Sequence, residues 1–426
     1  MKSKKRNTVL SQDDIATICN VYDEIQFGID LNDFLSSLFG SGKVVRSVVV
    51  NGEAKWGRID QKSLLKIVDG ITKNRDIGAK WSVTNLLNNL IDVLLMNKVS
   101  GVEDIRNILD TFCNDICEAE PLEYEICMPI YGVSITKGRC ISVGKYSFLH
   151  TDYLIDKKFS KIEGLDAACE PSKFWHTDCF VGMSVCACEA GKAKELALSE
   201  FRWIENAVRF SLPGKMYGAG ITSYDVKWTE RILVALKDRG VAGLSSSLKG
   251  PLMPIKIESL VSIKEFRLML EVLGKPSAQL TELQKRIKHA IYLCGLSMQT
   301  SELSVSYFLC VAAMEALFCK QENPYVSPSI AQQIVESFCF LIFEEKNRRW
   351  CFDELRNLYG NRSAIAHGSE RELAEDDVVK VRVFLMIAVN KLLTDDTLSK
   401  IATVSGLQEL VKDLKFGKHK TKEATK

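Results

Sequence analysis

The segment SELSVSYFLCVAAMEALFCK, residues 301–320, limits the possible folds more than any other stretch of the chain. Its spacing predicts a helix that is apolar on nearly every side, and such a helix is stable only when other elements surround it. Helical patterns before and after it can supply that cover, and Thr281 is placed to cap the first of them. We therefore predict a compact five-helix bundle over residues 279–415. The four surrounding segments are TELQKRIKHAIYLCGLSMQ, SPSIAQQIVESFCFLIFEEK, NRRWCFDELRNLYGNRSAIAHG and EDDVVKVRVFLMIAVNKLL.

The chain before this bundle changes character near Pro121. Residues 1–120 have mostly helical patterns, interrupted by KVVRSVVVNGEAKWGRID, whose Val-rich run and Asn-Gly turn predict a hairpin. Residues 121–213 contain short apolar runs broken by glycine turns and end in an amphipathic helical pattern, KAKELALSEFRWIENAVRFSL. They predict a small α+β unit with an antiparallel sheet.

Residues 214–278 are interpreted as connecting helices and loops. VKWTERILVALKD and SIKEFRLMLEVL are predicted helices, and the Gly-rich stretches GKMYGAG and GVAGLSSSLKG are predicted loops. Neither Gly-rich stretch has the Lys-Ser/Thr ending of a phosphate-binding loop. The expected fold class is α+β, predominantly α-helical, and the basic tail over residues 416–426 is too polar to pack.

The charge balance excludes a strongly basic protein. Lys and Arg number 56 and Asp and Glu number 54, so the formal net charge is +2 and any nucleic-acid contact needs a local basic patch. The basic start MKSKKRN is not followed by an apolar signal segment. The longest apolar runs, such as FCFLIF and VFLMIAV, are too short to cross a bilayer. We expect a cytoplasmic protein without membrane contacts.

The 14 cysteines include no CxxC pair and are most simply free thiols. The densest group is His176, Cys179, Cys186 and Cys188. Cys186 and Cys188 would share one face of a strand, which could seed a zinc site. The alternative is that these are core cysteines of a buried strand.

Arg362 and His367 lie five residues apart near the end of a predicted helix. On an ideal helix they point roughly 140° apart, so they act together only if the helix bends or ends, and Gly368 favours an end. In one interpretation His367 complements the helix dipole and Arg362 pairs with a carboxylate such as Glu354. In the other the pair cuts RNA. Imidazole moves protons near neutral pH, guanidinium binds phosphate through two hydrogen bonds, and the RNA 2′-hydroxyl is the nucleophile.

The sequence around this pair resembles the HEPN domains, and most closely their ApeA-like branch. Ala313–Phe318 is similar to the branch pattern ALE-x-LF, with Met314 in place of Leu. Tyr359–Gly368 matches the pattern Y-x-x-RS-x-I-x-HG, and TELQKRIKHAIYL looks like the first helix of that branch. The resemblance covers roughly residues 280–395.

The resemblance implies a C-terminal HEPN-type bundle that is a metal-independent endoribonuclease and acts as a homodimer. Arg362 and His367 are the implied catalytic pair, which the same pair of a second copy completes. Ser363 takes the polar position that follows the arginine, and Asn361 and Tyr359 would line the cleft. No cofactor and no metal are implied.

Packing adds one expectation to this set. Glu315 belongs to the buried apolar helix, and a buried carboxylate needs a cationic or hydrogen-bonding partner. We therefore expect Glu315 to hold Arg362 in place.

The resemblance also implies a biological setting. The protein would be a toxin or effector of antiviral (anti-phage) defence that cuts RNA and leaves a 2′,3′-cyclic phosphate. The N-terminal region would sense a phage-derived trigger or an inhibitory partner. One alternative is a non-catalytic HEPN module for dimerisation or RNA binding. Another is a nucleotidyl-transfer target or antitoxin partner, with Tyr359 as the acceptor.

Overall fold

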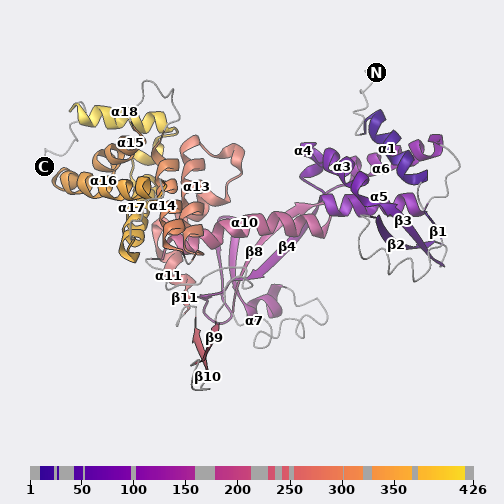
Figure 1. Ribbon diagram of the computed structural model, residues 1–426, viewed down its shortest axis with the longest axis horizontal. Helices are drawn as coiled ribbons and strands as arrows, with labels where there is room; N and C mark the ends of the chain where they lie inside the picture. The colour runs from indigo at the N-terminus through magenta and orange to yellow at the C-terminus, as the bar shows by residue number, and fades with distance from the viewer. Residues whose placement is uncertain are drawn as a thin grey trace. The chain divides into compact units, whose positions relative to one another are not determined.

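The computed structural model describes most of the chain. The described residues are 10–23, 26–27, 43–50, 53–96, 102–158, 178–212, 229–235, 242–248, 254–300, 302–319, 329–366 and 373–417. They are mostly helical and include a small antiparallel sheet of four strands, which confirms the predicted α+β, predominantly helical class (Figure 1). Contacts divide the chain into two units, residues 1–126 with 184–198 and residues 127–183 with 199–426.

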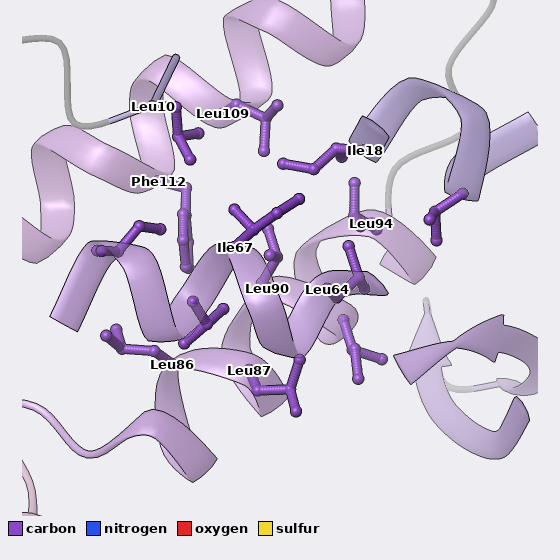
Figure 2. Close-up of a cluster of buried hydrophobic side chains, with 14 of the residues drawn as sticks. Leu10, Ile18, Leu64, Ile67, Leu86, Leu87, Leu90, Leu94, Leu109 and Phe112 are labelled. Atoms are coloured by element: carbon purple, nitrogen blue, oxygen red, sulfur yellow. The ribbon is translucent and has the colours of Figure 1, made fainter. Parts of the chain in front are cut away.

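The first unit packs its helices around an aliphatic core. The helices are α1 (Gln12–Asp23), α3 (Gln61–Thr72), α4 (Arg75–Gly78), α5 (Val83–Met96) and α6 (Val102–Glu118). Asp60 caps α3 by accepting the backbone N–H of Lys62 at 3.0 Å. Figure 2 shows Leu64 of α3, Leu90 of α5 and Phe112 of α6 converging in this core, where all three are buried. Apolar residues at helical spacing therefore produce the predicted helical region.

The predicted hairpin of the first unit is present. It consists of β2 (Lys43–Val50) and β3 (Glu53–Asp60), which pair antiparallel with Val50 opposite Glu53. The short strand β1 (Gln26–Phe27) pairs antiparallel with the other edge of β3. The register leaves two residues for the connection, as the Asn-Gly turn predicted, although that turn itself lies outside the described residues.

The four-stranded sheet has the order β4-β8-β7-β6. Its strands are β4 (Leu122–Pro129), β6 (Cys140–Val143), β7 (Tyr146–His150) and β8 (Cys179–Ala187). Gly144, with φ of 58°, occupies the two-residue turn between β6 and β7, a conformation that favours glycine. After β7 the chain forms the short helix α7 (Thr151–Tyr153) and one π-helical turn over residues 154–158. After β8 comes the predicted amphipathic helix α10 (Ala190–Phe210).

The region interpreted as connecting helices and loops is partly different. VKWTERILVALKD was predicted as a helix, but residues Thr229–Ala235 form strand β9. This strand pairs antiparallel with β10 (Ala242–Leu248), where a Gly-rich loop was predicted (Figure 1). A short run that contains Thr, Ile and Val fits a strand as well as a helix by periodicity, and cross-strand pairing decides between them. GKMYGAG lies outside the described residues.

The other predicted helix of this region is present, together with a short helix and a short strand that were not predicted. SIKEFRLMLEVL forms helix α12 (Lys264–Gly274), which follows the short helix α11 (Ile257–Ser262). Strand β11 (Ile255–Lys256) pairs parallel with β5 (Val133–Ser134). The backbone of Thr136 and the carboxylate of Glu258 reinforce this connection with a hydrogen bond of 2.7 Å.

The predicted bundle forms, with one helix more than the sequence pattern indicated. Its helices are α13 (Glu282–Ser297), α14 (Leu303–Phe318), α15 (Ile330–Ser337), α16 (Arg348–Ala366), α17 (Glu375–Thr394) and α18 (Val404–Lys415). Thr281 caps α13 in a reciprocal capping box with Gln284. The apolar helix α14 contacts all five others, as its lack of a polar face requires. None of the helices in the described ranges combines the length and apolarity needed to cross a bilayer.

Candidate functional site

Helix α16 carries the segment that resembles the HEPN motif. It continues without a break through Ala366, so Tyr359, Asn361, Arg362 and Ser363 all lie on its last two turns. His367 lies outside the described residues. The prediction that the helix ends at His367 therefore stays a prediction.

The Arg362 side chain is held between α16 and α14. Its Nε lies 3.3 Å from Oε1 of Glu315, and the Tyr359 hydroxyl donates to the same Oε1 at 3.0 Å. The guanidinium carbon lies 5.2 Å from the ring centre of Phe308 and 5.8 Å from that of Tyr359, within cation–π range. Glu315 thus receives a cation and a phenol, which are the partners that its position on the apolar helix requires.

The free edge of this guanidinium is the chemically useful part. The Arg362 side chain is 28% exposed, and Glu315 engages it through Nε. Within the part of the chain that the structure describes, Nη1 and Nη2 of Arg362 make no hydrogen bond. An arginine fixed through Nε presents these two groups together, and such a pair can donate two parallel hydrogen bonds to a phosphate.

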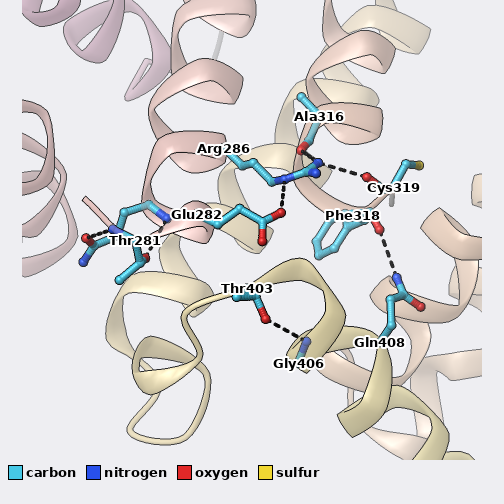
Figure 3. A network of polar contacts seen from close by, with 10 residues as sticks. Thr281, Glu282, Arg286, Ala316, Phe318, Cys319, Thr403, Gly406 and Gln408 are labelled. Atoms are coloured by element: carbon cyan, nitrogen blue, oxygen red, sulfur yellow. Dashed lines mark hydrogen bonds and ion pairs between the residues drawn. The ribbon is translucent and has the colours of Figure 1, made fainter. Parts of the chain in front are cut away.

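The C-terminal end of α14, next to Glu315, is held by side chains of two other helices, and Figure 3 shows these contacts. Nη1 of Arg286 in α13 donates to the backbone carbonyls of Ala316 and Cys319, each at 2.9 Å. Nε2 of Gln408 in α18 donates to the carbonyl of Phe318, also at 2.9 Å. The last carbonyls of a helix have no partner within the helix, so these side chains cap the turn that carries Glu315.

The phenol of Tyr359 is held in its protonated form. Burial and the neighbouring Glu315 carboxylate raise its pKa to about 12. At neutral pH it is therefore a hydrogen-bond donor to that carboxylate, and its oxygen is a weak nucleophile. This setting suits a positioning role better than the role of an acceptor in nucleotidyl transfer.

The two other predicted cleft residues differ in exposure. Asn361 is only 6% exposed, and its Oδ1 has no hydrogen-bond partner among the described residues. Ser363 is half-buried. The structure thus brings Glu315, Tyr359 and Arg362 together.

Phe308 is a site residue that the sequence reasoning missed. It precedes Glu315 by seven residues on α14, and this spacing places both on one helix face. The residue is 40% exposed next to the guanidinium, although half of the residues of this helix are buried. The seven-residue spacing is the signal that could have identified it.

The sequence left two interpretations for His176, Cys179, Cys186 and Cys188, a zinc site or core cysteines of a buried strand. Cys179 begins β8 and is buried, Cys186 near its end is exposed, and Cys188 follows the strand. Burial raises the pKa of the Cys179 thiol, which disfavours the thiolate that a metal would bind. Over the described residues no three His, Cys, Asp or Glu side chains gather as a metal site would need. His176 lies outside that part of the chain, so the choice between the two interpretations stays open.

Comparisons with known proteins do not identify this site. No protein-family model, no curated protein and no solved structure matches the chain.

Proposed function

We propose that the protein is a metal-independent endoribonuclease of the HEPN type. The observation that carries the proposal is the free edge of Arg362. Glu315 and two aromatic rings hold the guanidinium, and its Nη groups have no hydrogen-bond partner among the described residues, five residues before His367. Arg362, which would bind the phosphate, precedes His367 by five residues, and the imidazole of His367 can transfer protons near neutral pH.

The mechanism uses the RNA 2′-hydroxyl as the nucleophile. Arg362 binds the scissile phosphate and offsets the charge that develops on its oxygens. His367 removes the proton of the 2′-hydroxyl or protonates the departing 5′-oxygen. The 2′-oxygen forms a bond to phosphorus as the bond to the 5′-oxygen breaks, which leaves a 2′,3′-cyclic phosphate. One imidazole cannot do both proton transfers in a single step, so a second copy of the motif from a homodimer supplies the other.

The biological role in this proposal follows from the resemblance to ApeA-like HEPN proteins. The bundle would act as a toxin in the cytoplasm during anti-phage defence. The N-terminal region would respond to a phage-derived trigger or an inhibitory partner.

A non-catalytic module is the second candidate. The Glu315–Arg362 contact that can present a phosphate-binding edge also serves as a clamp between α14 and α16. On this hypothesis the bundle binds RNA or a second copy without cutting, and His367 has no chemical role.

The experiment is RNA cleavage by the full chain in EDTA. The variants are Arg362→Ala, Arg362→Lys and His367→Ala. Arg356→Ala is the matched control, because Arg356 is an exposed arginine of the same helix. We expect Arg362→Ala and His367→Ala to lower the cleavage rate by roughly 10²–10³-fold, the usual effect of removing one charge-stabilising group. Arg362→Lys should fall between, since it keeps the charge and loses the two-point contact.

Two outcomes contradict the nuclease proposal. Cleavage that stops on chelation would require a metal, and cleavage that survives both Arg362→Ala and His367→Ala would arise elsewhere. RNA binding without cleavage, unchanged in His367→Ala, would favour the non-catalytic module. The products should carry a cyclic phosphate, which mass spectrometry distinguishes from a 3′-phosphate by the mass of one water.

A further inference from the structure

Phe308 exposes an aromatic side chain on the apolar helix α14. Five large apolar residues of this helix are at most 3% exposed, namely Tyr307, Val311, Met314, Leu317 and Phe318. Phe308 and Val305, one turn earlier, are instead 40% and 44% exposed. Exposed apolar side chains are common on protein surfaces, so the neighbours of Phe308 decide what its ring can do.

The ring of Phe308 lies beside the guanidinium of Arg362, whose carbon is 5.2 Å from the ring centre. Glu315, seven residues after Phe308 on α14, contacts Nε of the same guanidinium at 3.3 Å. The two Nη groups of Arg362 make no hydrogen bond within the described ranges. An aromatic residue that is partly open to solvent therefore adjoins the edge that can donate to a phosphate.

A nucleotide is a ligand that offers a partner to both groups. Its phosphate can accept two parallel hydrogen bonds from the Nη edge of Arg362. Its base has a flat face, and bases stack on aromatic side chains whatever their sequence. Because a single sugar joins the base to the phosphate, the two contacts can form side by side.

A base that stacks on Phe308 must be unpaired. Inside a duplex, the neighbouring bases cover both faces of each base. The major groove of an RNA duplex is also too deep and narrow for side chains to read. Loops and single-stranded segments leave base faces open, and aromatic side chains stack on bases of this kind.

We propose that Phe308 stacks on an unpaired base that flanks the phosphate bound by Arg362, and that the substrate of this site is single-stranded RNA. The inference rests on the proposed function, because it takes the phosphate at Arg362 to be that of RNA. Phe308 is then a residue that selects unpaired RNA at the point of cleavage. It does not select a sequence, since every base has a face that can stack.

The other role open to Phe308 is to hold Arg362 in place without contacting RNA. The cation–π contact of 5.2 Å is compatible with this role as well. The two roles differ in one measurable respect. A ring that only positions Arg362 affects every substrate equally, whereas a ring that stacks affects only substrates that carry the base.

The test is a double-mutant cycle between the ring and the base, with the full chain in EDTA. Wild type and Phe308→Ala are given a single-stranded RNA and two versions of it with an abasic ribose, on one or the other side of the cleaved phosphate. Stacking of one base contributes about 1–3 kcal/mol, so Phe308→Ala should lower kcat/KM on the intact RNA by about 5- to 150-fold. One abasic RNA should show a similar loss with wild type and no further loss with Phe308→Ala.

Phe352→Ala is the matched control. Phe352 is also 40% exposed, and the guanidinium carbon of Arg356 lies 5.7 Å from its ring centre. It precedes Arg362 by ten residues, which is roughly 15 Å along α16, so its loss should not couple to either abasic position. Phe308→Tyr keeps the aromatic ring and should keep the coupling. Phe308→Leu keeps an apolar side chain without a ring and should lose it.

Two results would overturn the proposal. Phe308→Ala that slows cleavage of intact and both abasic RNAs by the same factor would show that the ring only positions Arg362. Wild type that cuts a fully paired RNA duplex as fast as the single strand would show that no unpaired base is needed.

The failure of the nuclease proposal has a different signature. Wild type would then bind RNA without cutting it, and the same cycle is measured as binding affinity, with 2′-deoxyribose at the cleavage position. Coupling between Phe308 and the base in that assay supports stacking without cleavage, and its absence overturns stacking. Wild type that neither binds nor cuts RNA overturns both proposals.

Discussion

Replacing Arg286 with alanine should loosen the end of α14 that positions Glu315. Arg286 donates to two carbonyls at 2.9 Å and pairs with Glu282 at 3.0 Å (Figure 3). Hydrogen bonds from a charged donor contribute about 1.5–3 kcal/mol each. Because the Arg286 side chain is 26% exposed, the lower end of that range applies, and two such bonds give about 3 kcal/mol.

The ion pair with Glu282 adds little to this value. The Glu282 side chain is 45% exposed, and such pairs on one helix contribute roughly 0.3–0.5 kcal/mol. Glu282→Gln therefore serves as the control that removes the ion pair and keeps both carbonyl contacts. Arg286→Lys should retain part of the effect, because a single ammonium cannot reproduce the planar fork of the guanidinium.

The assay is denaturant unfolding combined with hydrogen exchange of peptides from α14. Arg286→Ala should lower the unfolding free energy of the second unit by about 3 kcal/mol. The loss of protection should be largest in the last turn of α14, next to Glu315. If Arg286→Ala costs no more than Glu282→Gln, or if exchange at the end of α14 does not change, the carbonyl contacts do not hold this turn.

Two further changes test the packing and the charges of the second unit. A Cβ added at Gly295 would lie 2.5 Å from Cβ of Asn206, so Gly295→Ala should cost about 1–3 kcal/mol of unfolding free energy. A Cβ added at Gly360 meets nothing within 4 Å, so Gly360→Ala should stabilise α16 by about 0.5–1 kcal/mol. If denaturation shows that Gly295→Ala and Gly360→Ala change the unfolding free energy in the same direction, the packing argument is wrong. Burial alone would raise the pKa of Glu258, but hydrogen bonds from Thr136 outweigh it and hold this pKa below its usual value. Glu258→Gln should therefore destabilise the protein at neutral pH, and the difference from wild type should vanish in acid as Glu258 protonates through its lowered pKa; a difference that is independent of pH would contradict this assignment.

The spacing of apolar residues along the chain explains why much of the fold could be predicted from the sequence. The helix α14 has no polar face, so a surrounding bundle was the one stable arrangement, and Thr281 marked where that bundle begins. The β9–β10 hairpin escaped prediction because the seven residues TERILVA fit a helix and a strand by periodicity, and only the partner strand decides between them. The extra helix α18 carries a clear amphipathic pattern, and Thr403 caps it, so its signal was present in the sequence.

The sequence predicted which residues of the candidate site contact each other, but not the geometry of the contact. The expectation that a carboxylate on an apolar helix needs a partner led from Glu315 to Arg362, although the two residues are 47 positions apart and the Glu315 side chain is 22% exposed. The same rule does not say which nitrogen of Arg362 the carboxylate contacts. That choice depends on the crossing of α14 and α16, and it decides whether the Nη edge is available to a phosphate.

Three arginines of the second unit, Arg209, Arg362 and Arg382, show how the neutralising partner determines what a cation can do. Arg209 pairs with Glu205 one turn earlier on α10, and both side chains are 5% exposed, so this pair is closed to any ligand. Arg362 also has a carboxylate, but its side chain is 28% exposed and its Nη groups make no hydrogen bond to the described residues. Arg382 has no carboxylate partner in the described part of the chain and is 3% exposed, and its contacts there are the hydroxyls of Ser297 and Ser306, so it too is closed to a ligand. Only the first of these settings can be read from spacing along one helix, because the other two depend on which helices meet. A guanidinium is therefore a candidate for ligand binding when its charge is balanced and its donors are not, and among these three only Arg362 meets both conditions.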